Sequence, residues 1–165
     1  MPICRIEDMT IDTFPITDEN RSDYNICKEM LLKPANFRLV CFSLPSDEGF
    51  HLKHAILNFW KDREFCRSVT VCDFTQDLIA AIHSGNYPYD MGKYWEPEVL
   101  VIDDLQHVAG KEATQEEFYN ILKHRLEQKK LTVVFSEYTL THMRGAMRDE
   151  LIHLLRAGVH TDSGI

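Results

Sequence analysis

Short apolar runs that alternate with amphipathic segments limit the fold of this sequence more than any other feature. The apolar runs are predicted to be strands, at residues 38–42, 68–72, 98–102 and 131–135, with a short fifth at 158–161. Apolar side chains recur at helical spacing in the intervening segments, at residues 50–62, 74–83, 114–128 and 142–155. Strands that are apolar throughout indicate a parallel sheet with helices on both faces. We therefore predict an α/β fold.

Composition narrows the class of protein further. The chain has 165 residues, which is one domain's worth, and a formal net charge of −8 that argues against a surface built for nucleic acid. Its apolar stretches fall short of the roughly 20 residues needed to cross a membrane. Five cysteines without a CxxC pair favour a reduced, cytoplasmic setting, with Cys41 and Cys72 buried in strands.

Two acidic residues, Asp103 and Asp104, directly follow the most apolar strand. Ligands of such sheets bind beyond the carboxyl ends of the strands, where two carboxylates can hold magnesium and orient a water molecule. The acids could equally cap a turn or pair with a nearby lysine, and both interpretations stay open. The following helix is predicted to begin with a capping box formed by Thr114 and Glu117.

The segment after the first strand has the position of a phosphate-binding loop but not its chemistry. Its candidate phosphate-binding residues are Ser43, Ser46, Gly49 and Phe50. A single glycine cannot readily form the wide nest of amides that surrounds phosphates, and no lysine follows it. Asp47 and Glu48 would each repel a phosphate by a few kcal/mol at about 4 Å. Lys53, one helical turn further on, is predicted to point elsewhere.

The residues after the central strand resemble a known family. VLVIDDLQHVAGKEATQEEFYNIL, at residues 99–122, resembles the Walker B strand and following helix of the bacterial replication initiator DnaA. Further resemblance lies at Thr13-Phe14, Asn20-Arg21, residues 51–56 and residues 74–78. The resemblance implies an AAA+ P-loop-type three-layer sandwich with a five-stranded, mainly parallel sheet. Residues 1–165 would form one core subdomain, without the family's lid and C-terminal DNA-binding domain.

Several family positions carry different residues in this chain. The phosphate-loop lysine falls on Gly49, or on Glu48 if the alignment gap moves by one residue. The sensor acid falls on Glu137-Tyr138, and the arginine finger on Leu154, with Arg156 close by. The single-stranded-DNA contact motif reads Lys111-Glu112-Ala113. Of the catalytic set only Asp103 and Asp104 remain, and Asp103 would bind a metal only if a nucleotide with magnesium binds.

These departures predict a DnaA-like module without ATPase activity, which acts by protein–protein interaction in replication initiation or its regulation. The expected partners are replication proteins: a DnaA-family ATPase, the helicase or the clamp. No cofactor is expected beyond weakly bound ATP or ADP with magnesium, and direct DNA binding is not expected. The alternative is a divergent ATP-binding AAA+ protein that oligomerises or binds DNA at origins.

Two further features have open interpretations. The aromatic segment at residues 87–95 is either an interface or a loop packed on the protein itself. His51 and His54, three residues apart on a helix, favour an ordinary helix over a metal site, and His107 is predicted to be a surface residue.

Overall fold

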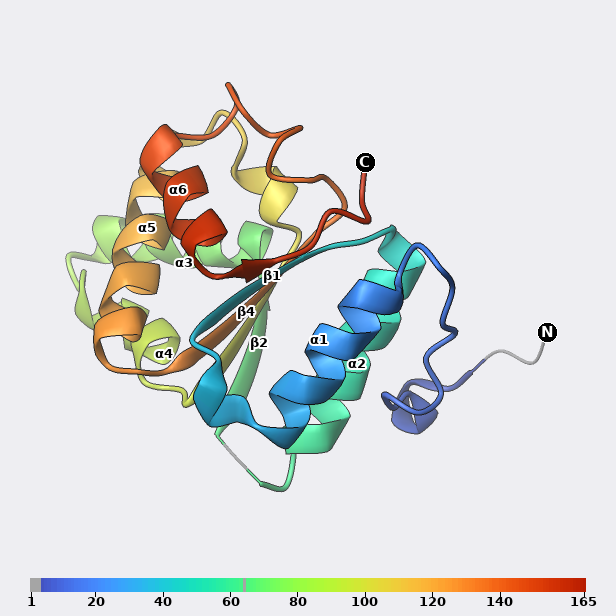
Figure 1. The fold of residues 1–165 in the computed structure, drawn as a ribbon. Coiled ribbons are helices and arrows are strands. Elements are labelled where there is room, and N and C mark those ends of the chain that lie inside the picture. The colour runs from blue at the N-terminus through green and yellow to red at the C-terminus, as the bar shows by residue number, and fades with distance from the viewer. Residues whose placement is uncertain (1–3, 64) are drawn as a thin grey trace.

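In the computed structural model, which describes residues 4–63 and 65–165, five strands form one parallel sheet between two layers of helices (Figure 1). The strands are β1 (Leu39–Ser43), β2 (Cys66–Thr70), β3 (Val99–Asp103), β4 (Leu131–Ser136) and β5 (Val159–His160). Their order across the sheet is β2-β3-β4-β1-β5, and every neighbouring pair is parallel. The predicted α/β fold with a five-stranded sheet is confirmed.

The helices divide between the two faces of the sheet. They are α1 (Arg21–Leu32), α2 (Ser46–Trp60), α3 (Val71–Ser84), α4 (Gly92–Trp95), α5 (Glu112–Glu127) and α6 (Asp149–Ala157), with short 3₁₀ turns η1 (Ile6–Asp8), η2 (Pro34–Asn36), η3 (Tyr89–Met91) and η4 (Leu105–Val108). Figure 1 shows α1 and α2 on one face and α3 to α6 on the other. Alternate residues along the strands belong to two hydrophobic cores, one on each face of the sheet. Val40 and Phe42 pack beneath α1 and α2, whereas Cys41 and Ile102 pack on the opposite side. Burial on both faces explains why β1, β3 and β4 are largely apolar, whereas the edge strand β2 exposes Arg67 and Ser68.

The β2–α3 junction differs from the prediction. The strand ends at Thr70, because the Thr70 hydroxyl accepts a 3.1 Å hydrogen bond from the backbone N–H of Asp73 and so caps α3. Cys72 therefore lies in the first turn of a helix and is exposed, so the prediction that it is buried was wrong. Cys41 is fully buried in β1, as predicted.

Two helix starts were also predicted wrongly. Helix α5 begins two residues before Thr114, whose hydroxyl lies 3.3 Å from that of Thr75 on α3 instead of capping the helix. Glu117, the other half of the expected capping box, accepts a 2.7 Å hydrogen bond from the Tyr87 hydroxyl. Residues 142–148, predicted as helix, form turns that include Gly145 at a φ of 86°, and α6 starts only at residue 149.

The aromatic segment at residues 87–95 is divided between surface and core, because Tyr87 and Tyr89 are exposed to solvent whereas Tyr94 packs inside the protein. Tyr94 is buried and its hydroxyl donates to Asp77 on α3. The wholly buried guanidinium of Arg125 donates to the carbonyls of Tyr94 (3.2 Å) and Pro97 (2.8 Å), and also binds the carbonyl of Leu131. Burial lowers the pKa of Arg125 to about 10. This arginine thus ties α4 and the start of β3 to β4.

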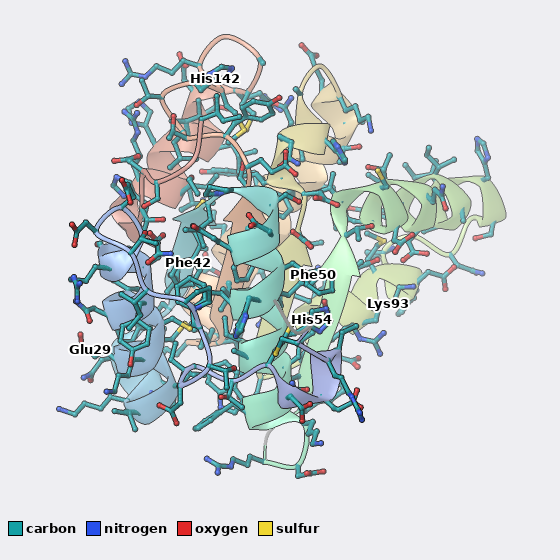
Figure 2. The ribbon with its side chains drawn as sticks, turned by 90° about the vertical axis from the view of Figure 1, so that its right-hand side faces the viewer. Glu29, Phe42, Phe50, His54, Lys93 and His142 are labelled. Carbon is teal, nitrogen blue, oxygen red and sulfur yellow. The ribbon has the colours of Figure 1, made fainter. Side chains whose placement is uncertain are left out.

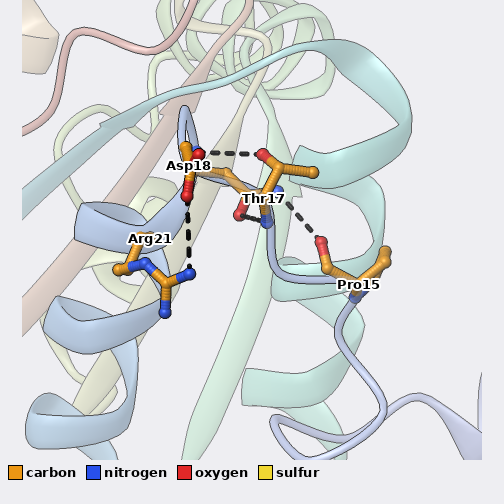
Figure 3. Close-up of polar contacts among 5 residues, drawn as sticks. Pro15, Thr17, Asp18 and Arg21 are labelled. Atoms are coloured by element: carbon orange, nitrogen blue, oxygen red, sulfur yellow. Dashed lines mark hydrogen bonds and ion pairs between the residues drawn. The ribbon is translucent and has the colours of Figure 1, made fainter.

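Polar contacts near α1 hold the segment that precedes this helix and the C-terminal residues. Asn20 is buried and bridges the Pro15 carbonyl (3.0 Å) and the Thr17 amide (2.7 Å), while Arg21 pairs with Asp18 (Figure 3). At the other end, Ser163 donates a 2.5 Å hydrogen bond to the buried carboxylate of Asp23. The C-terminus consequently lies on the side of the sheet where β1 leads into α2 (Figure 1).

None of the helices in the described part of the chain is both long and apolar enough to cross a membrane.

Candidate functional site

A small pocket of about 70 Å³, lined by both polar and apolar residues, lies at the carboxyl ends of β1, β3 and β4. Its lining includes Ser46, Gly49, Phe50, Asp103, Asp104 and Glu137. Parallel strands bring these residues to one edge of the sheet, as the sequence predicted for the paired acids. Pockets that hold drug-sized ligands measure roughly 300–1,000 Å³, so this one is several times smaller.

The connection from β1 to α2 contains only two residues, Leu44 and Pro45. The loop between β1 and α2 is therefore shorter than predicted: Ser43 ends the strand, and Ser46 and Gly49 already belong to α2, as does Phe50, which was expected to be helical. The Gly49 N–H donates to the Pro45 carbonyl at 2.9 Å, which is an ordinary helical bond.

The physical reason for the early helix start lies in its first turn. Pro45 precedes the helix, and Asp47 and Glu48 follow within the first turn, where carboxylates interact favourably with the positive end of the helix dipole. The same two acids that would repel a phosphate thus stabilise a helix in place of a loop.

The backbone amides at the end of β1 are engaged within the protein. The N–H of Ser43 donates to the Thr161 hydroxyl at 2.9 Å, and the N–H of Leu44 donates to the Ser136 carbonyl at 2.9 Å. Gly164 also approaches so closely that a Cβ there would lie 2.4 Å from the Glu137 carbonyl oxygen. The C-terminal residues therefore lie against the end of the strand from which a phosphate loop would begin.

Lys53 forms an ion pair with Asp103. Its Nζ lies 2.7 Å from Asp103 Oδ2, and the two side chains are only 15% and 23% exposed. The prediction that Lys53 points elsewhere was wrong, because residues one helical turn apart share a face, and Lys53 follows the pocket residues Gly49 and Phe50 by one turn. Of the two interpretations left open for the acids, the pairing with a lysine holds for Asp103.

Asp104 has a different environment from its neighbour. Its backbone is left-handed, with a φ of 61°, and its N–H donates to Asp103 Oδ1 at 2.9 Å. The pKa of Asp104 is raised by burial first and then by the charges of Asp103 and Glu137, while His107 and Lys53 act in the opposite direction. Asp104 thus holds a proton more readily than a free aspartate.

The other residues singled out from the sequence lie away from this pocket or have structural partners. Leu154 is partly buried against the α5–α6 side of the core, and the Arg156 guanidinium donates to the Thr141 hydroxyl at 2.9 Å. Lys111, Glu112 and Ala113 are exposed at the start of α5.

The two histidines of α2 have separate surroundings. His51 Nε2 lies 3.1 Å from the Thr10 carbonyl and 3.2 Å from the Thr13 hydroxyl. The ring of His54 packs on Phe50 with centroids 4.4 Å apart, and both lie on one side of α2 (Figure 2). Within residues 4–63 and 65–165, no three His, Cys, Asp or Glu side chains are grouped as metal ligands would be.

The family model and the curated relatives that match this chain point to one family. The family described as "Bacterial DnaA ATPAse domain" matches residues 6–162. The chromosomal replication initiator protein DnaA 2 of Chlamydia caviae is 32% identical over 162 residues, covering 92% of this chain and 34% of the relative. The DnaA of Symbiobacterium thermophilum is 38% identical over 134 residues, covering 78% of this chain and 29% of that relative. The chain thus spans about a third of the length of these relatives.

Solved structures agree on the fold. AMPPCP-bound DnaA from Aquifex aeolicus superposes with a TM-score of 0.86 at 23% identity, over 94% of this chain and 50% of that one. Domain III of the Thermotoga maritima replication initiation protein DnaA superposes with a TM-score of 0.84 at 22% identity, over 93% of this chain and 65% of that one. At these identities the likeness establishes the fold alone.

Proposed function

Because this chain belongs to the bacterial DnaA ATPase-domain family, we propose that it is an AAA+ module that does not hydrolyse ATP and acts in replication initiation through protein–protein contacts. The observation that carries the proposal is the two-residue connection between β1 and α2. Phosphate loops bind through a nest of free backbone N–H groups. Here Pro45 has no N–H, and the amides of Ser43 and Leu44 are already hydrogen-bonded within the protein.

The charges around the end of β1 also disfavour a triphosphate. Burial raises the pKa of Glu48, and the nearby carboxylates of Asp47, Asp23 and Glu19 raise it further. Several acids are therefore gathered where the phosphates of a nucleotide would bring further negative charge. Phosphoryl transfer depends on stabilising that charge, so the arrangement opposes both binding and turnover.

The ion pair of Lys53 with Asp103 is a third supporting feature. Asp103 is the residue that would bind magnesium beside a nucleotide, and its Oδ2 is already paired with an ammonium group at 2.7 Å. A metal ion would have to displace Lys53 and leave that lysine without its partner. The side chains described at this edge of the sheet therefore do not fit a magnesium nucleotide.

Titration calorimetry with AMPPCP and magnesium tests the nucleotide part of the proposal. We expect no saturable heat at ligand concentrations up to about 1 mM, which corresponds to a binding free energy weaker than about −4 kcal/mol. The Aquifex aeolicus protein, which was solved with AMPPCP bound, is the matched positive control. A micromolar dissociation constant for the present chain would overturn the proposal.

The interaction part needs a separate experiment. We propose that the partners are replication proteins, namely a DnaA-family ATPase, the helicase or the clamp. Affinity purification of the tagged chain from its native cells, quantified against an unrelated α/β protein with the same tag, should enrich one of these classes. Enrichment of unrelated proteins alone would contradict this assignment.

A divergent ATP-binding protein that oligomerises or binds DNA at origins is the second candidate. The observation in its favour is that Asp103 and Asp104 stand at the end of β3, where an ATPase would need them. A turnover assay of the wild type and an Asp104→Asn variant separates the two functions. Phosphate release that disappears in the variant would favour this second candidate.

A further inference from the structure

An exposed thiol and an exposed imidazole meet on the edge of the sheet that also carries the paired acids. Cys72 lies in the first turn of α3, which directly follows β2, and His107 lies in η4, shortly after β3. Strands β2 and β3 are parallel neighbours, with Thr70 opposite Asp103, so the two segments leave the sheet side by side. The Cys72 Sγ is 3.5 Å from the His107 Nδ1, and both residues are exposed to solvent.

This geometry is the one that activates a cysteine. The thiolate is the reactive form, and an imidazole within hydrogen-bonding distance can accept the thiol proton. Cys72 also lies at the N-terminus of a 14-residue helix, whose dipole favours a negative charge at that end. His107 also lies close enough to Asp104 to lower the pKa of that carboxyl, and Asp73 lies beside Cys72 in the first turn of α3.

The other cysteines lack this combination. Burial raises the pKa of Cys27 and Cys41 to about 12, and that of the half-buried Cys66 to about 11. Cys4 is exposed, and the contact described for its thiol is with the Arg5 carbonyl at 3.7 Å. Cys4 is therefore an internal reference for an exposed cysteine without an imidazole beside it.

We propose that Cys72 and His107 form a site of covalent modification by low-molecular-weight disulfides. His107 accepts the proton of the Cys72 thiol, and the thiolate attacks one sulfur of the disulfide. A new sulfur–sulfur bond joins Cys72 to that half of the reagent. The other half leaves as a thiolate and takes up the proton from His107, so electrons and atoms balance without another reactant. The site does not depend on nucleotide or on a partner protein, and it is independent of the function proposed above.

The test compares reaction rates with oxidised glutathione at neutral pH, followed by intact mass and peptide mapping. In the wild type, the mixed disulfide should map to Cys72 before it appears at Cys4. The variants Cys4→Ser and Cys72→Ser isolate the two thiols, and we expect Cys72 to react about tenfold faster. Equal rates, or faster reaction at Cys4, would overturn the proposal.

The role of His107 is tested in the Cys4→Ser background. His107→Gln keeps a side chain that can hydrogen-bond but cannot accept the proton, and His107→Asn provides a second version if the first disturbs the fold. Both should reduce the rate at Cys72 to that of Cys4 and remove the imidazole step from its pH–rate profile, with an unchanged circular dichroism spectrum. A fast reaction at Cys72 whose rate is unchanged in both His107 variants would refute the pairing.

Discussion

Replacing Lys53 with methionine removes the internal counter-charge of Asp103 while keeping much of the lysine's apolar volume. The two groups are 2.7 Å apart and their side chains are 15% and 23% exposed. A hydrogen bond between charged groups contributes roughly 1.5–3 kcal/mol, whereas exposed ion pairs contribute about 0–1 kcal/mol. Because this pair is mostly but not fully shielded from water, we expect Lys53→Met to lower the free energy of unfolding by about 2 kcal/mol.

A double-mutant cycle separates this interaction from other effects of the substitution. Urea unfolding followed by circular dichroism is measured for the wild type, Lys53→Met, Asp103→Asn and the double variant. The coupling energy should be about 1–2 kcal/mol, because the double variant leaves no unpaired charge at either position. Lys123, exposed on α5, is the matched control, and Lys123→Met should change stability by less than about 0.5 kcal/mol.

Two results would refute the reasoning. A coupling energy below about 0.3 kcal/mol would mean that the pair contributes nothing beyond its separate members. An equal loss of stability in Lys123→Met would mean that the effect belongs to lysines in general.

Three further changes have outcomes that follow from the structure. Arg125→Leu leaves buried carbonyls without a hydrogen-bond donor and should destabilise the protein by about 3–5 kcal/mol in thermal unfolding. Arg125→Lys should lose less stability. Gly158→Ala should cost about 1–3 kcal/mol in urea unfolding, because its Cβ would lie 2.5 Å from the Leu39 carbonyl oxygen. Burial raises the pKa of Asp23 above its ordinary 3.8, so its contribution to stability is present below that pH and is lost as the pH rises through the folded-state pKa. Asp23→Asn should therefore flatten the decline in stability above about pH 4, and an unchanged pH profile would contradict this cause.

The sheet could be predicted from the sequence because its inner strands β1, β3 and β4 are buried on both faces. Residues such as Val40 and Cys41 face opposite cores, so an unbroken apolar run is required and is easily recognised. The convergence of Asp103 and Asp104 with the end of β1 followed from the parallel order of the strands.

The details of the site could not be predicted in the same way, because they depend on where α2 begins. The sequence pattern suggested that the helix begins at residue 50, whereas Pro45 and the acids of the first turn start it at Ser46. The pairing of Lys53 with Asp103 joins α2 to the end of β3, fifty residues away, and has no local signal in the sequence. The contact of Cys72 with His107 joins residues 35 positions apart and has no local signal in the sequence.

The position of β1 in the sheet has a consequence for synthesis of the chain. Its neighbours β4 and β5 both come late in the sequence, and the Ser43 amide finds its partner Thr161 only 118 residues later. Translation at about 5–20 residues per second makes this interval on the order of 10 s. During that time β1, all five residues of which are buried in the finished sheet, is an apolar strand with two unpaired edges. Until its partner strands are synthesised, β1 is therefore exposed to binding by chaperones and to aggregation.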